Sequence, residues 1–217
     1  MKDRSNNDQS HSKRFPHLIN RIFVPITIST ALFFSAASAQ DTAGIDSLMA
    51  LCIPISATGE SVRAALPEAG WRVLGKPRAA EPVANLIASQ MWHLAADSSP
   101  QKRLDLTGDY TNGVYASLGT AFLGLVFTRG DDVAMVLADG DSLSCIWAGP
   151  KSDALLARIE AIGGLPEAEG TVIGAKTQTV EAGGTDYSRI ETYAFIARTD
   201  RAGPLPYAAR LDRFPTQ

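Results

Sequence analysis

The chain has 217 residues, of which 45% are apolar and 20% are charged, a composition typical of a globular protein rather than of a disordered or fibrous one. Its formal net charge is −3, so the composition as a whole shows no excess of positive charge for a polyanionic partner. The length is enough for one domain with its own hydrophobic core.

The first 39 residues have the pattern of a secretory signal peptide. A polar and basic opening precedes an uncharged apolar run over residues 22–34, and small residues follow, ending in Ala37-Ser38-Ala39. This order is typical of a cleaved leader, so we expect cleavage after Ala39. The alternative is an uncleaved membrane anchor, but the apolar run has 13 residues and contains Pro25, whereas a spanning helix needs about 20 residues.

The sequence therefore predicts a periplasmic or secreted protein, in which residues 40–217 form a single α+β domain without stable membrane insertion. Cleavage removes five basic and two acidic residues, which leaves 15 basic and 21 acidic ones and a net charge of −6. Because no basic patch remains, we expect no nucleic-acid partner.

Two cysteines, Cys52 and Cys145, lie in this exported part. An even number of cysteines in an oxidising compartment favours a disulfide. The bond would join residues 93 positions apart, and the chain-entropy model gives it about 4–5 kcal/mol of stabilisation. The alternatives are two buried free thiols, or one thiol that acts as a nucleophile.

Residues 41–96 are predicted to be mainly helical. Apolar residues at helical spacing predict short helices over 41–51 and 60–69, and residues 71–74 read as a short extended piece. The clearest helical stripe covers residues 82–96. Trp92 projects from the opposite side of that helix, so either a second layer covers it or it is a candidate surface for a partner.

Residues 97–113 are polar and rich in turn residues, and we predict a loop. A three-stranded meander is predicted over 114–148, with strands at 114–127, 133–138 and 143–148. Both alternating sets of side chains are apolar between Val114 and Ala138. Such a hairpin is buried on both faces, by helices or by a second subunit, so it is also a candidate homo-oligomer contact.

A helix over residues 151–162 and a second β group over 171–214 complete the prediction. The β group has strands at 171–180, 186–198 and 207–214, and a Gly183-Gly184 turn joins the first two. Four polar residues are expected on a solvated face: Lys176, Gln178, Arg189 and Glu191. The fold class is α+β, with an antiparallel sheet of about five to six strands packed by three to four helices, either as one sheet or as two halves.

Little catalytic or metal chemistry is predicted. The exported part has one histidine, His93, whereas a zinc site needs three or four protein ligands. We interpret His93 as a residue at the boundary of its helix's apolar stripe, and we expect no metal and no cofactor. The sequence has neither a Gly-x-Ser-x-Gly elbow nor a glycine-rich nucleotide loop.

Two weaker patterns leave a hydrolase open. Ser99 and Lys102 match Ser-x-x-Lys, the nucleophile motif of penicillin-binding enzymes, but they fall in the predicted loop and the companion motifs are missing. Two acidic pairs could serve a glycosidase: Glu167 with Glu169, and Asp131 with Asp132.

Three functions follow in order of preference. The first is a non-enzymatic binding or accessory domain that contacts a protein or a small molecule of the cell envelope through a sheet face or the Trp92 side of its helix. The alternative is an envelope-polymer hydrolase that uses carboxylates or the Ser–Lys pair. The third is a purely structural envelope component.

Overall fold

The computed structural model describes residues 43–94, 98–119, 125–150, 153–167, 171–196 and 205–216. The predicted leader and its cleavage site lie outside these residues. No helix within them is both long and apolar enough to cross a membrane.

The described residues form one eight-stranded sheet in which every neighbouring pair is antiparallel. In spatial order the strands are β1 (Arg72–Leu74), β2 (Val126–Arg129), β3 (Asp132–Asp139), β4 (Ser142–Gly149), β8 (Tyr207–Pro215), β7 (Thr185–Ile196), β6 (Thr171–Ala182) and β5 (Leu165–Glu167). The predicted antiparallel sheet is confirmed, and of the two arrangements that the sequence left open, one sheet or two halves, the structure has one sheet. Its strand number exceeds the prediction because two three-residue strands, β1 and β5, extend it at the edges.

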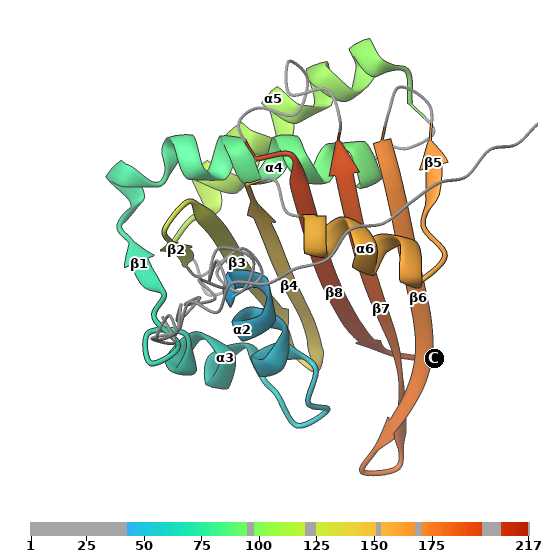
Figure 1. Cartoon of the computed structure of the whole chain (residues 1–217). Coiled ribbons are helices and arrows are strands. Elements are labelled where there is room, and N and C mark those ends of the chain that lie inside the picture. The colour runs from blue at the N-terminus through green and yellow to red at the C-terminus, as the bar shows by residue number, and fades with distance from the viewer. Residues whose placement is uncertain are drawn as a thin grey trace, which may run out of the picture. The chain divides into compact units, whose positions relative to one another are not determined.

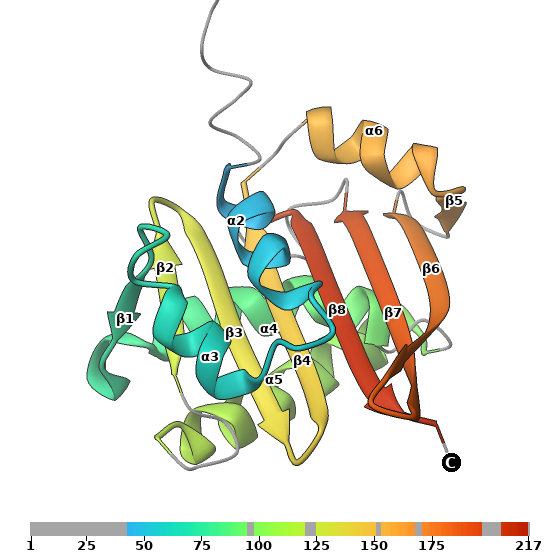
Figure 2. The same ribbon diagram turned by 90° about the horizontal axis from the view of Figure 1, so that it is seen from below.

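Helices lie on both faces of this sheet, as Figures 1 and 2 show from two directions. One face carries α2 (Ala43–Cys52), α3 (Gly59–Ala65) and α6 (Asp153–Ala161), and the other carries α4 (Ala80–Leu94) and α5 (Pro100–Ser117). A short 3-10 helix, η1 (Lys76–Arg78), precedes α4. The helices within the described ranges are thus more numerous than the three to four expected.

Each face has its own hydrophobic core, and the strands β2 and β3 contribute to both. Ala134 and Val136 pack with α2 and α3, whereas Val133 and Met135 pack with α4. The alternation of a strand sends neighbouring residues to opposite faces, so a strand that is apolar throughout needs two covers. The predicted burial of both faces is confirmed for these strands, and helices of the same chain provide the cover.

The prediction of a loop over residues 97–113 is wrong, because α5 occupies Pro100–Ser117. The Ser99 side chain accepts a hydrogen bond from the Lys102 backbone N–H and caps this helix. Two glycines lower the intrinsic helix propensity of this segment, so tertiary packing decides its conformation. Three of its apolar side chains lie against the core that contains α4: Leu106, Val114 and Tyr115.

The predicted strand over residues 114–127 is also largely wrong. Residues 114–117 end α5, and β2 begins at Val126. The meander itself is confirmed with this later start, since β2, β3 and β4 pair in sequence. Apolar composition alone does not separate a packed helix from a strand over so short a segment.

The predicted disulfide is present. Cys52, the last residue of α2, is bonded to Cys145 in β4, with the two Cα atoms 6.5 Å apart and both residues fully buried. Neither cysteine is free, which removes both thiol alternatives. The bond fixes the carboxyl end of α2 to the middle of the sheet.

Candidate functional site

The hairpin formed by β6 and β7 is the longest pair of strands in the sheet, with twelve residues in each strand. A two-residue turn joins them, and Gly183 and Gly184 both have positive φ, as a type I′ turn requires. The pairing with β8 ends at Tyr187, so the tip of the hairpin extends past β8 (Figure 1).

The outer edge of β6 is only partly paired. The short strand β5 contacts Thr171, Val172 and Ile173, and no other strand in the described part of the chain pairs with β6 on that side. We call residues 174–182 the open edge. An unpaired edge presents its backbone N–H and C=O groups as a template for another strand.

The turn determines which residues present those groups. Ala182 and Thr185 flank the two-residue turn and are therefore a hydrogen-bonded pair, and hydrogen-bonded and non-hydrogen-bonded pairs alternate from there along an antiparallel ladder. Even-numbered residues of β6 thus direct their backbone groups toward β7. The odd-numbered residues direct them away from it, and all four on the open edge are exposed: Ala175, Thr177, Thr179 and Glu181.

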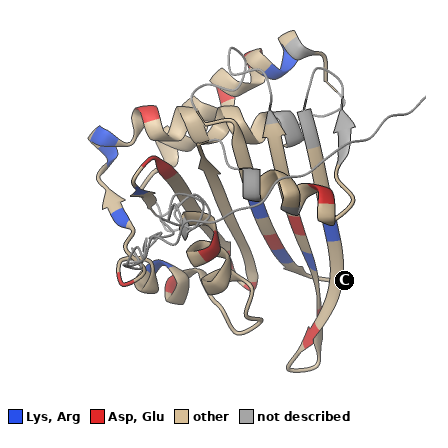
Figure 3. Cartoon of the chain, in the orientation of Figure 1, with Lys and Arg blue, Asp and Glu red and all other residues tan. Residues whose placement is uncertain are grey.

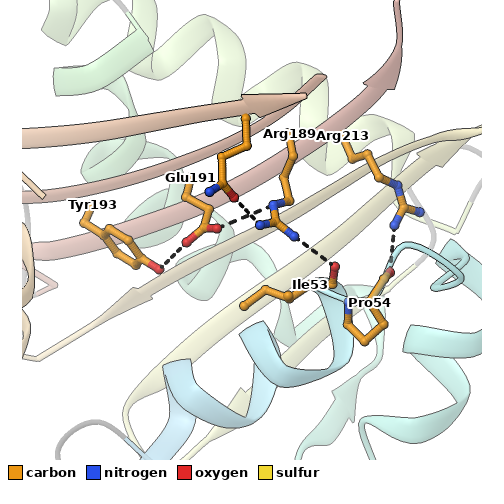
Figure 4. Close-up of polar contacts among 7 residues, drawn as sticks. Ile53, Pro54, Arg189, Glu191, Tyr193 and Arg213 are labelled. Atoms are coloured by element: carbon orange, nitrogen blue, oxygen red, sulfur yellow. Dashed lines mark hydrogen bonds and ion pairs between the residues drawn. The ribbon is translucent and has the colours of Figure 1, made fainter. Parts of the chain in front are cut away.

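A polar strip crosses the face of the hairpin that also carries α2 and α6. We define it as Gln178, Arg189, Glu191, Tyr193 and Arg213, and Figure 4 shows its contacts. The Arg189 guanidinium donates a hydrogen bond to the Gln178 side-chain carbonyl and lies 3.6 Å from the Glu191 carboxylate. The Tyr193 hydroxyl donates to the other oxygen of Glu191 at 3.3 Å.

The two arginines of the strip also hold the turn that follows α2. Arg189 donates to the Ile53 carbonyl at 3.5 Å, and Arg213 donates to the carbonyls of Pro54, at 2.8 Å, and Ala57. Ile53 and Pro54 directly follow the end of α2, where the helix dipole favours positive charge. The arginines therefore fasten the turn after the disulfide-bonded end of α2 to β7 and β8.

Arg213 is 5% exposed. Its burial lowers the pKa of the guanidinium below its ordinary value, and Arg189 acts in the same direction, whereas Tyr187 and Asp141 oppose the change. The Tyr187 ring lies 5.9 Å from the guanidinium carbon. The hydrogen bonds donated by its two terminal nitrogens offset part of the cost of burying this charge, while its Nε has no hydrogen-bond partner in the described part of the chain.

The prediction that this face is solvated is only partly right. Lys176 is exposed, but the side chains of Arg189 and Glu191 are 18% and 17% exposed. Arg189 contacts the Ile53 carbonyl in the turn after α2, which comes from a distant part of the sequence, and Glu191 contacts Arg189 and Tyr193. Figure 3 shows charged residues of both signs on β7 and β8, in contrast to the uncharged strand β4 beside them.

Lys176 differs from the arginines because its charge is not compensated. It lies directly opposite Glu191 in the register, but Glu191 is engaged with Arg189 and Tyr193. Within the described residues Lys176 forms no ion pair. The open edge thus carries an exposed positive charge.

The candidate site residues predicted from the sequence belong neither to the open edge nor to the polar strip. Trp92 and His93 belong to α4, but their side chains lie outside the described part of the structure. Ser99 and Lys102 are both exposed at the start of α5, where the Ser99 hydroxyl serves as the helix cap. Their expected position in a loop is therefore corrected. Glu167 lies in β5, whereas Glu169 is outside the described residues.

The second acidic pair borders a cavity of about 340 Å³, together with Glu81 and Asn85. Asp131 is exposed and Asp132 is buried. A Cβ atom on Gly44 would lie 1.8 Å from one oxygen of Asp132, and one on Gly149 would lie 2.5 Å from the other. The two glycines leave room for this carboxylate at the first turn of α2, where the helix dipole stabilises it.

In the described ranges no group of three or more His, Cys, Asp or Glu residues is arranged to hold a metal ion. No family model, no curated protein and no solved structure matches the chain.

Proposed function

We propose that this protein is an exported binding domain that holds an extended polypeptide segment along the open edge of β6. The observation that carries the proposal is the row of four exposed residues whose backbone groups are directed away from β7: Ala175, Thr177, Thr179 and Glu181. In strand addition such main-chain groups supply the affinity, and alternate side-chain positions supply the specificity.

The surroundings of the open edge support a binding role. The disulfide holds the end of α2 to β4, and the two arginines hold the turn after α2 to β7, a strand of the hairpin, and to its neighbour β8. A preformed edge loses little conformational freedom when a partner strand pairs with it, which favours binding. The disulfide is typical of oxidising compartments, which supports export.

The test compares two double variants of the open edge. In T177P/T179P, proline removes two outward N–H donors and leaves the hydrogen bonds to β7 in place. In the matched control, T177A/T179A, the donors remain and only the hydroxyls are lost. Twelve-residue peptides selected from a random phage-displayed library against the exported protein are the probes.

We expect the selected peptides to bind the native protein and the alanine control with similar affinity. Loss of two hydrogen bonds should weaken binding to the proline variant at least about tenfold. Urea unfolding of both variants verifies that the hairpin is intact. Equal binding to all three proteins, or a selection that enriches no peptide, would refute the proposal.

A further inference from the structure

The open edge carries two charges that point to the chemistry of its occupant. Lys176 and Glu181 are both exposed, five residues apart, and neither forms an ion pair within the described residues. Because five is an odd number, their side chains project from opposite faces of the sheet. Lys176 shares the face of the polar strip, and Glu181 lies on the other face.

Lys176 is placed for a close cross-strand contact. Its backbone groups are directed toward β7, so toward an added strand it occupies a non-hydrogen-bonded position. In antiparallel pairs these positions bring the Cα atoms within about 4.5 Å, and opposite charges there stabilise the pair. An acidic side chain opposite Lys176 would continue a row of alternating charge, because Glu191 lies on the other side of Lys176.

We infer that the occupant is an extended segment that pairs antiparallel with β6 and has the pattern Lys/Arg-x-x-x-x-Asp/Glu, with its basic residue opposite Glu181 and its acidic residue opposite Lys176. This inference rests on the proposed function and deepens it. The antiparallel direction follows the rest of the sheet, in which every described pair is antiparallel. In that direction the residue opposite Glu181 precedes the residue opposite Lys176 by five positions.

A second copy of the chain does not satisfy this pattern. In an edge-to-edge dimer with two-fold symmetry the axis is perpendicular to the sheet, so each residue lies opposite one that projects from the same face. Lys176 and Glu181 project from opposite faces, and symmetric pairing never brings one opposite the other. The open edge of a second copy is thus excluded, and we assign the occupant to a different protein.

The experiment uses two synthetic twelve-residue peptides built from threonine and valine. The lysine-first peptide has a lysine as its fourth residue and a glutamate as its ninth, and the glutamate-first peptide has these two charges exchanged. Both are titrated into the exported native protein and into the variant K176E/E181K, and the NMR shifts of the open-edge amides report binding. Neither the peptides nor the proteins differ in net charge, so general electrostatic attraction cancels.

We expect the native protein to bind the lysine-first peptide about tenfold more tightly than the glutamate-first peptide, and K176E/E181K to reverse this preference. A preference that is the same in both proteins, no preference, or an inverted preference in the native protein overturns the inference. If the peptides still bind and T177P/T179P abolishes their binding, the proposed function stands without the charge pattern. If neither peptide shifts the open-edge amides, both fail.

Discussion

At the scale of single residues, Arg213 is a buried charged side chain that donates hydrogen bonds to backbone carbonyls. Its planar guanidinium donates in two directions, to the carbonyls of Pro54 and Ala57, from a strand more than 150 positions away in the sequence. A lysine at this position would keep the charge but lose the fixed fork of donors. These two hydrogen bonds offset part of the cost of burying the guanidinium, whose Nε has no hydrogen-bond partner in the described part of the chain.

Replacement of Arg213 by Met should lower the free energy of unfolding by about 1–3 kcal/mol, because the buried Ala57 carbonyl loses the Arg213 donor, whereas the Pro54 carbonyl keeps its hydrogen bond from the Ala57 N–H. R213K should recover only part of this loss. The matched control is R78M in η1, an exposed position where a change within about 0.5 kcal/mol is expected. Urea unfolding under oxidising conditions measures all three, and a native midpoint for R213M would contradict the role assigned to this residue.

At the scale of elements, the hairpin of β6 and β7 is hydrogen-bonded to another strand along most of one side and is mostly unpaired on the other side. The side toward β8 belongs to the continuous sheet, whereas the opposite side is paired only where β5 reaches it. Natural proteins commonly keep such edges short or charged, since a long open edge favours association. Here the edge is long and has only two charged residues, which is consistent with a binding surface.

Amide hydrogen exchange should alternate along the open edge. The amides of Thr177 and Thr179 should exchange at nearly unprotected rates, whereas those of Lys176 and Gln178 should exchange about a hundredfold more slowly, because opening the β6–β7 ladder costs about 3 kcal/mol. Residue-resolved NMR measures these rates. Uniform protection of all four amides would mean that another segment already covers the edge.

At the scale of the whole molecule, one covalent bond links elements that are remote in sequence. The disulfide joins the first described helix to a central strand and lies within the larger of the two cores. The two arginines reinforce the same junction with hydrogen bonds. Reduction of this bond should therefore affect the whole domain rather than a local segment.

The double variant C52A/C145A should lose about 2–5 kcal/mol of folding free energy, since the bond restricts a long loop of the unfolded chain. Unfolding of the native protein in reductant should approach the same value, and the variant itself should not respond to reductant. The comparison uses urea midpoints at one protein concentration. A variant as stable as the oxidised native protein would show that packing alone holds α2 in place.

Local patterns in the sequence determined the elements whose signal lies in neighbouring residues. The continuous apolar strand β3 required cover on two faces, the Gly183-Gly184 pair required a tight turn, and two cysteines in a chain with a leader pattern favoured a disulfide. Each of these predictions depends on periodicity, backbone conformation or composition within one segment, and each is confirmed by the structure.

Only the tertiary structure decided which element packs against each segment and which segments stay uncovered. Packing on α4 made a helix of residues expected to form a loop, and the turn after α2 contacts Arg189 on a face expected to be solvated. The open edge of β6 likewise depends on where β5 ends. These features arise from contacts between residues far apart in the chain, and a local pattern records that a residue is apolar or polar but not which element lies against it.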